Sequence, residues 1–503
     1  MKFLGIRNHH DCNITYTDGT KVRYMKLERL LQEKHFVAPN NTVIVKLENE
    51  IKKILDHAKK VFNIDFRDLD GVAFSVANYP EYFPPINELY KRTNYGIWTQ
   101  FDCPVFCVDH HYAHALSCWP LVDYNSIQKH VVMDGAGDNG KFFCFFENNK
   151  LTDFVDLSDN ESFSWFLRDI GGHCGLEGHR LDFAGKLMAL KAMHTVPQDR
   201  IDHIMKMANP LHLRHLRQFL NLFPAEPPLN KVHLAHLFMQ EKMPEYLRKH
   251  IMPYETFTYS GGTAQNTIIN REIRKVFPNV IIPPHCPDDG ISLGLVEFLR
   301  QHFNQDPFDK SNFPFWQSDE APAETPSDKT IDETAELLAQ GKIVGWYQGH
   351  GELGPRALGN RSILMNPVIE NGKDIINSKV KHRESFRPFG ASVLLEDTPR
   401  FFDCYEESPY MLYVYRCFEQ EKYKSIVHMD GTCRIQTVNQ EPQHEHYYRL
   451  IESFKKKTGI TMLLNTSLNV NGKPIAGYID NAKELFYNTE MDALVVGNDT
   501  CKK

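Results

Sequence analysis

The chain has 503 residues, which exceeds the size of one average domain, so we expect two or three domains. Its hydrophobic fraction of 42% and charged fraction of 24% are typical of a soluble globular protein, and the net charge of −7 excludes a uniformly basic surface but not a local basic groove. No signal-peptide core or membrane-length apolar run is present, and the 11 cysteines lack CxxC spacing, so we expect a cytoplasmic protein with reduced thiols and no membrane partner.

The first 160 residues contain the same pattern of predicted elements twice. FLGI, NITYT and KVRYMKLERL read as strands, with a hairpin signal at Asp18-Gly19. Residues 42–62 carry apolar positions at helical spacing, the buried-type strands GVAFSV and PVFCV follow, and YAHALSCWPL begins another helix. Near residue 130 the strand and hairpin pattern restarts in HVVMDGAGDNGKFFCFFENNKLTDF. This repetition predicts a duplicated α/β unit with a ligand cleft between its copies.

The second half of the chain contains the predicted domain boundary. Residues 186–250 are predicted to be helical, and residues 305–329 are rich in proline and polar side chains, as in a linker. TIDETAELLAQGK then predicts a helix with Asp332 or Thr330 near its start and Gly341 at its end, followed by the strand IVGWYQG. We therefore expect domains at residues 1–304 and 330–503, joined by a linker at 305–329.

Three histidines in VDHHYAHALSC suggest a metal site. If a helix starts at His110, this residue and His114 lie on one face, close enough to bind one ion. Imidazoles suit Fe, Zn, Mn or Ni, and an added carboxylate shifts the preference towards harder ions. The acidic candidates, which follow strands or turns, are Asp134 and either Asp288 or Asp289. The competing interpretation is a helix capped by Asp109 with ordinary histidines, since the chain has 24 of them.

Glycine and arginine clusters predict a nucleotide or phosphate pocket. DGAGDNG (134–140) and SGGTAQN (260–266) each follow an apolar run, and glycine allows close approach of a phosphate or nucleobase to the backbone. GHGELGPRALGNRSIL (349–364) lacks the lysine of the GxxxxGK[ST] loop but offers arginine forks. KVKHRESFRPFG (379–390) adds basic groups, and Asn465, Ser467 and Asn469 alternate on a predicted strand. Each cluster alone also fits a polar loop or a solvated face; together they favour a binding pocket.

These motifs closely resemble the O-carbamoyltransferase family of antibiotic and nodulation-factor biosynthesis. The matching segments in the second half are GPRALGNRSIL, HRESFRPFGASVL, LLNTSLNVNGKPI and GNDT. Those in the first half are HDCNITYTDG, LERLLQEKH, DHHYAHALS, AGKLMAL, SGGTAQNTIIN and CPDDGISLG. They occur in family order from about residue 3 to residue 500. The resemblance implies an α/β fold, with an actin-like, duplicated ribonuclease-H-like N-terminal domain and a YrdC-like C-terminal domain.

The resemblance also implies a reaction and its site residues. The C-terminal domain would form carbamoyl-adenylate from carbamoyl phosphate and ATP with Mg²⁺, and the N-terminal domain would transfer the carbamoyl group to a hydroxyl beside a metal ion. The family's usual ion is Fe²⁺, with Mn²⁺ or Zn²⁺ as alternatives. The implied catalytic residues are His10, as base, and Lys34, which would steady the developing charge. The implied metal ligands are His110, His114, Asp134 and Asp288, with Asp289 as the alternative to the last.

The resemblance and the clusters above together imply two sets of nucleotide-binding residues. Those expected to contact the adenylate in the N-terminal domain are Gly135, Gly137, Gly261, Gly262 and Asn266. Those expected to hold phosphates and ATP in the C-terminal domain are Arg356, Arg361, Ser362, Lys381, Arg383, Arg387, Asn465, Ser467 and Asn469. The segment LEGHRLDFAGKLMAL matches the family only in part.

The acceptor hydroxyl is predicted from charge. Residues 186–275 contain 13 Lys and Arg against 7 Asp and Glu, a local charge of +6, which suits a polyanion. Tyr254, Phe257 and Tyr259 are predicted to stack on a flipped base. Because the compact length also resembles bacteriophage-encoded members, we expect 5-hydroxymethylcytosine in DNA as the acceptor, in the host cytoplasm if the protein is viral, and allow for a homodimer. The alternatives are a small natural product or sugar, a non-catalytic nucleotide- or DNA-binding protein, and a tRNA threonylcarbamoylating enzyme.

Overall fold

A first mixed sheet forms the base of the N-terminal half. The computed structural model describes residues 1–36, 44–75, 89–92, 100–123, 127–158, 161–193 and 196–503. The strands of this sheet are β1 (Phe3–Arg7), β2 (Asn13–Thr17), β3 (Val22–Lys26), β4 (Gly71–Ser75), β5 (Tyr90–Arg92) and β6 (Val105–Val108), in the spatial order β3-β2-β1-β4-β6-β5. β1 pairs antiparallel with β2 and parallel with β4. Short α1 (Leu27–Leu31) follows β3, and α2 (Ile44–Phe62) confirms the predicted helix, whose first two positions, 42 and 43, lie outside the described residues.

A second sheet repeats the connectivity of the first. Its strands are β7 (Lys129–Met133), β8 (Lys141–Glu147), β9 (Lys150–Asp156), β10 (Phe257–Ser260) and β11 (Val280–Ile281), in the order β11-β10-β7-β8-β9. As in the first sheet, a central strand pairs antiparallel with the next strand and parallel with a later one. This shared order is the ribonuclease-H-like arrangement, so the predicted duplication is confirmed.

Two helices pack between the repeated units and position the site. α3 (His110–Leu116) follows β6, and α10 (Ile291–His302) packs on α3, β1 and β4. The crossing of α3 and α10 is close because Gly294 has no side chain: a Cβ there would lie 1.9 Å from the carbonyl oxygen of Ala113.

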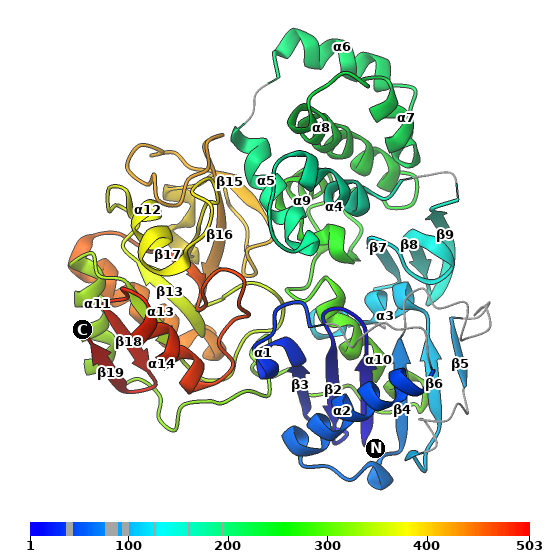
Figure 1. The fold of residues 1–503 in the computed structure, drawn as a ribbon, viewed down its shortest axis with the longest axis horizontal. Coiled ribbons are helices and arrows are strands. Elements are labelled where there is room, and N and C mark those ends of the chain that lie inside the picture. Colours follow the sequence, from blue (N-terminus) through cyan, green and yellow to red (C-terminus); the bar gives the residue numbers. More distant parts are fainter. Residues whose placement is uncertain (37–43, 76–88, 93–99, 124–126, 159–160, 194–195) are drawn as a thin grey trace.

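A group of helices is inserted between β9 and β10, and we call residues 161–250 the helical insertion. Its main helices are α4 (Phe163–His173), α5 (Phe183–Met193), α6 (Gln198–Ala208), α7 (Leu216–Asn221) and α8 (Pro228–Leu247), drawn in green at the top of Figure 1. The predicted helical character of 186–250 is confirmed, and positions 194 and 195 lie outside the described residues. α9 (Thr267–Val276) follows β10.

The aromatic residues proposed to stack on a flipped base lie just after this insertion. Phe257 and Tyr259 belong to β10, and both side chains are fully buried in the core. The prediction that they stack on a base is therefore wrong, because all four residues of β10 are buried and neither ring is accessible to a ligand. Tyr254, which precedes β10, is exposed.

The C-terminal half contains an eight-stranded mixed sheet. Its strands are β12 (Val344–Tyr347), β13 (Arg361–Met365), β14 (Gly390–Leu394), β15 (Val414–Arg416), β16 (Thr432–Val438), β17 (Met462–Ser467), β18 (Ala493–Val496) and β19 (Asp499–Lys502), in the order β15-β16-β14-β17-β13-β12-β18-β19. α11 (Asp328–Ala339) and α13 (Glu445–Thr458) pack together against the sheet, and the remaining helices are α12 (Gly372–Ile376) and α14 (Ile479–Asn488). The predicted α/β class thus holds for both halves of the chain (Figure 1).

The start of α11 differs from the prediction. Ser327 is the N-cap, and its hydroxyl accepts a hydrogen bond from the backbone N–H of Thr330. Asp332 lies inside the helix, where it pairs with Lys457. The serine competes better for the cap because it precedes the whole helical run, whose first residue is Asp328. The predicted end at Gly341 is confirmed, since that residue has a φ of 78°.

The proline-rich segment between α10 and α11 packs against neighbouring parts of the protein. Residues 305–327 contain no helix or strand among those described, but Phe313 and Trp316 are buried. Trp316 stacks on Trp119 at 5.4 Å, and its carbonyl accepts a hydrogen bond from Tyr24 N at 3.2 Å. The segment therefore lies against the N-terminal half, and the boundaries near 304 and 330 stay a prediction. None of the helices described is both long and apolar enough to span a bilayer.

Candidate active site

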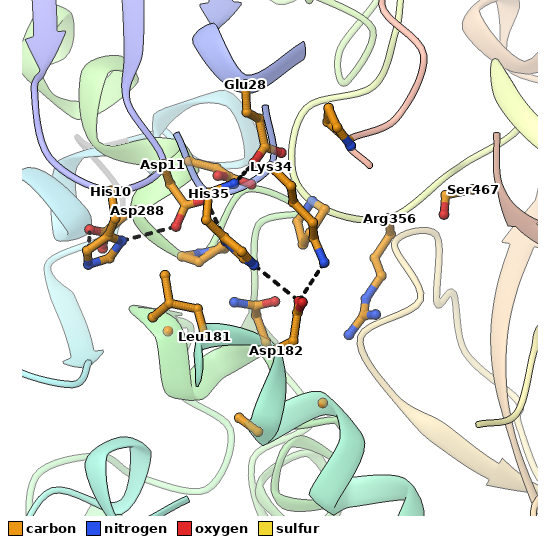
Figure 2. Close-up of a pocket in the computed structure, with 18 of the residues that line it drawn as sticks. His10, Asp11, Glu28, Lys34, His35, Leu181, Asp182, Asp288, Arg356 and Ser467 are labelled. Atoms are coloured by element: carbon orange, nitrogen blue, oxygen red, sulfur yellow. Dashed lines mark hydrogen bonds and ion pairs between the residues drawn. The ribbon is translucent and has the colours of Figure 1, made fainter. Parts of the chain in front are cut away.

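One cavity of about 600 Å³ lies where the two halves and the helical insertion meet. Its N-terminal wall includes His10, Lys34, Asp134 and Asp288, and its C-terminal wall includes the basic cluster that contains Arg356. Figure 2 shows His10, Lys34, Asp288 and Arg356 converging on one space from separate parts of the chain. The two groups of residues that the sequence predicted separately therefore share a single cavity.

The histidine pair lies beside two carboxylates. His110 Nε2 is 3.0 Å from Asp134 Oδ2, and His114 Nε2 is 3.2 Å from Asp288 Oδ1. The potential ligand atoms of these four residues all lie within 4.8 Å of one another. Asp109 caps α3 by accepting a hydrogen bond from Tyr112 N, as the competing sequence interpretation expected of this residue.

The structure distinguishes the two neighbouring aspartates. Asp288 faces the histidines, and its second oxygen accepts a hydrogen bond from Arg7 Nη2 at 2.7 Å. Although burial opposes ionisation, the charge of Arg7 holds the pKa of Asp288 well below its usual range. Asp289 points instead to Lys26 Nζ, at 2.7 Å, and burial raises the pKa of Asp289 to about 6. Sequence reasoning missed Arg7, whose signal is an arginine ending the buried strand FLGIR.

This donor set fits a divalent metal ion. Two imidazole nitrogens and two carboxylates match the ligand preference of Fe²⁺, Mn²⁺ or Zn²⁺ and do not discriminate among them. His111, on the same helix, lies apart from the cluster because its ring packs on Gly137, where a Cβ would come within 2.4 Å of it. The residues that would hold the ion are therefore the four that were predicted.

The two predicted catalytic residues both line the cavity. His10 Nε2 is 3.6 Å from Asp288 Oδ2, and His10 Nδ1 is 3.1 Å from Asp11 Oδ2. Burial lowers the pKa of His10, but Asp288 and Asp11 outweigh this effect and raise it. Lys34 Nζ donates to Asp182 Oδ1 at 2.6 Å, a partner from the helical insertion that the sequence did not indicate.

The glycine turns only partly reach the cavity. Gly135, Gly262 and Asn266 line it, and Gly262 N donates to Asp134 Oδ1 at 2.8 Å. Gly137 and Gly261 are not among the lining residues. Asn266 also caps α9 by accepting hydrogen bonds from two backbone N–H groups.

The C-terminal wall concentrates positive charge, and among its cations Arg387 has a carboxylate partner, Glu384, at 3.6 Å. The cations that line the cavity there are Arg356, Lys381, Arg383, Arg387, Arg434 and Lys473, and we call the first five the cationic wall. Among the residues described, Arg356 and Arg434 donate no side-chain hydrogen bond, and burial lowers the pKa of Arg356 to about 10. Burial and then Arg387 lower the pKa of Arg383 to about 9. Such mutual destabilisation is relieved by a bound anion. Sequence reasoning missed Arg434, a single arginine within the mostly buried strand β16.

Polar residues of β17 and of the segment just after it reach the cavity. Asn465, Ser467 and Asn469 all line it. Lys381 Nζ donates to the Asn469 side chain at 2.6 Å and to the Ser467 backbone carbonyl at 2.8 Å. Ser467 and Asn469 therefore hold the lysine of the cationic wall in place, while Asn465 Nδ2 donates to Ser392 Oγ at 2.9 Å.

Two predicted phosphate-binding residues do not line the cavity. Arg361 is fully buried and donates to the carbonyl oxygens of Gln348 at 2.6 Å and Gly349 at 3.0 Å and to Asp319 at 3.0 Å. Ser362 is also fully buried. Both terminal nitrogens of the Arg361 guanidinium donate to protein acceptors, so Arg361 supports the backbone of the glycine loop and does not face the cavity. The sequence could not distinguish this role from phosphate binding.

Comparisons with known proteins agree with this arrangement. The family described as Carbamoyltransferase C-terminus matches residues 335–503. Nodulation protein NolNO of Sinorhizobium fredii is 36% identical over 287 residues, which cover 51% of this chain and 41% of that protein. The 3'-hydroxymethylcephem-O-carbamoyltransferase of Amycolatopsis lactamdurans is 28% identical over 429 residues, 78% of this chain and 80% of that protein. The chain spans less than half the length of the NolNO and NolO relatives and 58% of nodulation protein U of Rhizobium tropici.

Among solved structures, component A of the Acidaminococcus fermentans (R)-2-hydroxyglutaryl-CoA dehydratase covers 59% of this chain and 97% of its own, at 12% identity and a TM-score of 0.35. That likeness is too low to support an inference. The protein is a two-part α/β protein with repeated sheets, and one cavity places the cationic wall near a cluster of four residues that could hold a metal ion. Residues 335–503 match the carbamoyltransferase family, and the chain is similar to O-carbamoyltransferases over a larger part of its length.

Proposed function

We propose that this chain is an ATP-dependent O-carbamoyltransferase. The observation that carries the proposal is the single cavity with the donor cluster at one wall and the cationic wall at another. Carbamate is a poor electrophile, so a route from it to a carbamoyl ester needs activation. An enclosed path between two reactive ends would protect the activated species from water.

The first stage would take place at the cationic wall. Carbamoyl phosphate and water give carbamate and phosphate; carbamate then attacks the α-phosphorus of ATP, forming carbamoyl-adenylate and releasing pyrophosphate. Each species carries phosphate or carboxylate oxygens, which arginine forks bind in pairs of hydrogen bonds. Arg356 and Arg434 have free guanidinium donors for this purpose.

The second stage would take place beside the donor cluster. The acceptor oxygen bonds to the carbamoyl carbon, the bond to the AMP oxygen breaks, and the hydroxyl proton leaves. His10 lies on the cavity beside Asp288 and would take that proton, since a histidine can act as a base near neutral pH. Lys34 would stabilise negative charge on the carbamoyl oxygen. A divalent ion held by His110, His114, Asp134 and Asp288 would supply Lewis acidity.

For the acceptor we propose a hydroxyl on a small molecule. The cavity is enclosed by three parts of the protein, and one relative is named for a hydroxymethylcephem. The expected alternative, 5-hydroxymethylcytosine in DNA, relied on the basic window at 186–275. Several of its cations already have carboxylate partners: Lys242 pairs with Glu245 at 2.9 Å, and Lys186 pairs with Glu384 at 2.5 Å. The burial of two of the three proposed stacking residues weakens it further.

The proposal is tested by supplying ATP, carbamoyl phosphate and a panel of acceptors to the metal-loaded enzyme. We expect pyrophosphate release that depends on carbamoyl phosphate, and AMP plus a carbamoylated product, identified by mass, with a small hydroxymethyl acceptor. DNA containing 5-hydroxymethylcytosine is the second arm, and a mass gain of one carbamoyl group there would reassign the acceptor. Absence of carbamoyl-phosphate-dependent pyrophosphate release would refute the reaction itself.

A further inference from the structure

Asp182 links the helical insertion to the catalytic edge of the first domain. It ends the short helical turn Arg180–Asp182, just before α5. Its Oδ1 accepts a hydrogen bond from Lys34 Nζ at 2.6 Å and lies 3.2 Å from His35 Nε2. Figure 2 shows this carboxylate reaching across the cavity from the insertion to both side chains. The contact spans 148 positions of sequence, so it exists only when the insertion is seated.

His35 is held rigidly in this contact. Its backbone has a φ of 55°, in the left-handed region that a non-glycine residue adopts at a cost, and its N–H donates to Glu28 Oε2 at 2.9 Å. Its ring stacks on His179 of the insertion, with ring centroids 4.5 Å apart. His35 is strained and is held by two separate segments of the chain. This indicates that the site requires this position of its side chain.

Asp182 carries one negative charge between two cationic side chains. Burial lowers the pKa of His35, but hydrogen bonds with Asp11 and Asp182 outweigh this and raise the pKa of His35 to about 9. One carboxylate, Asp182, is therefore shared between two cations at neutral pH. It orients Lys34, while Asp11 is a further carboxylate partner of His35.

Lys34 needs such orientation because its side chain has four rotatable carbon bonds and would otherwise sample many positions. In the view of Figure 2, Lys34 and Asp182 lie between the His10–Asp288 side and the Arg356 side of the cavity. In the proposed reaction the carbamoyl group moves from the Arg356 side to the His10–Asp288 side. The Lys34 ammonium would lie on that path.

We infer that Asp182 is a positioning residue: it fixes the Lys34 ammonium for carbamoyl transfer, and thereby makes transfer depend on seating of the helical insertion. The inference rests on the proposed carbamoyltransferase function. It concerns only the transfer stage, since Asp182 touches none of the cationic wall in the contacts described.

The test separates the two stages in Asp182→Asn, Asp182→Glu and Lys34→Met, with Asp202→Asn on exposed α6 as a matched control. For Asp182→Asn we expect pyrophosphate release within twofold of wild type, a 10- to 100-fold loss in kcat for transfer, and partial rescue by Asp182→Glu. In a Lys34→Met background, Asp182→Asn should cause no further loss, because the two residues act as one unit. An equal loss in both backgrounds, or unimpaired transfer, overturns the inference.

A second measurement does not depend on turnover. The rate at which acetic anhydride modifies Lys34, followed by mass spectrometry, should rise severalfold in Asp182→Asn and not in Asp202→Asn. Unchanged Lys34 reactivity would overturn the inference even if transfer fell. If the wild type releases no carbamoyl-phosphate-dependent pyrophosphate, the proposed function fails, while the reactivity of Lys34 still decides whether Asp182 positions it.

Discussion

Gly354 and Pro284 join the two reactive ends of the cavity: a Cβ on Gly354 would lie 2.1 Å from the carbonyl oxygen of Pro284. Gly354 precedes Arg356 of the cationic wall by two positions, and Pro284 precedes Asp288 by four. Arg29 stabilises the same contact between the two loops, since its guanidinium donates to the carbonyl oxygens of Glu352 and Gly354, each at 2.8 Å. The arginine loop and the metal-site loop are therefore placed relative to each other by direct backbone contact.

Gly354→Ala should disrupt the contact between Gly354 and Pro284. Gly354 has a φ of 82°, so alanine adds backbone strain of about 1 kcal/mol and a clash with Pro284 that only loop movement can relieve. We expect a loss of transfer of at least tenfold and a lowered unfolding midpoint. Gly459→Ala is the matched control, because its φ is 75° and a Cβ there meets nothing within 4 Å. Equal effects of the two substitutions on the unfolding midpoint would show that the contact is unimportant.

Arg434→Gln should separate stability from anion binding. Burial lowers the pKa of Arg434, and the charges of Arg356 and Arg383 lower it further, so removing one cation relieves repulsion. We expect the free protein to gain on the order of 1 kcal/mol in unfolding free energy. The increase in melting temperature caused by pyrophosphate should shrink, because stabilisation by a ligand follows its affinity. Arg416→Gln, at an exposed position, serves as control. A destabilised variant with an intact pyrophosphate response contradicts this view.

Metal retention should depend on the four-residue donor cluster. We expect His110→Ala and Asp134→Ala to reduce bound Fe²⁺ or Mn²⁺, measured by elemental analysis after dialysis, from about one ion per chain to background. His111→Gln changes the adjacent residue of the same helix, which faces Gly137, and should keep the ion. Loss of metal in all three variants, or in none, would argue against this cluster as the binding site.

The stability contributed by His35 should depend on pH. Its pKa of about 9 in the folded protein lies above the ordinary value of 6.5. Its stabilising contribution, on the order of 2–3 kcal/mol at most, is therefore complete below pH 6.5 and is lost as the pH rises through 9. We expect the difference in unfolding free energy between wild type and His35→Asn to shrink steadily over that range. A difference independent of pH would mean that the ring is neutral.

Local sequence patterns predicted secondary structure and helical faces correctly. The strand and hairpin repeat predicted the two similar sheets, and the spacing of His110 and His114 placed both rings on one helical face, because helix geometry alone dictates that relationship. Local patterns failed where more than one residue, or more than one role for a residue, fitted the same motif. Ser327, not Asp332, caps α11, and Arg361 binds carbonyl oxygens although its motif resembles a phosphate loop.

By itself the sequence determined the elements, the family resemblance and the residue types available for chemistry, since propensity, periodicity and motif spacing act over short stretches of chain. Only the tertiary structure decided which of Asp288 and Asp289 joins the histidines, because Arg7 and Lys26 select between them from other strands. It alone brought Asp182 to Lys34 across 148 positions. Such contacts depend on how whole elements pack, and packing energy is shared among many distant residues that no local pattern records.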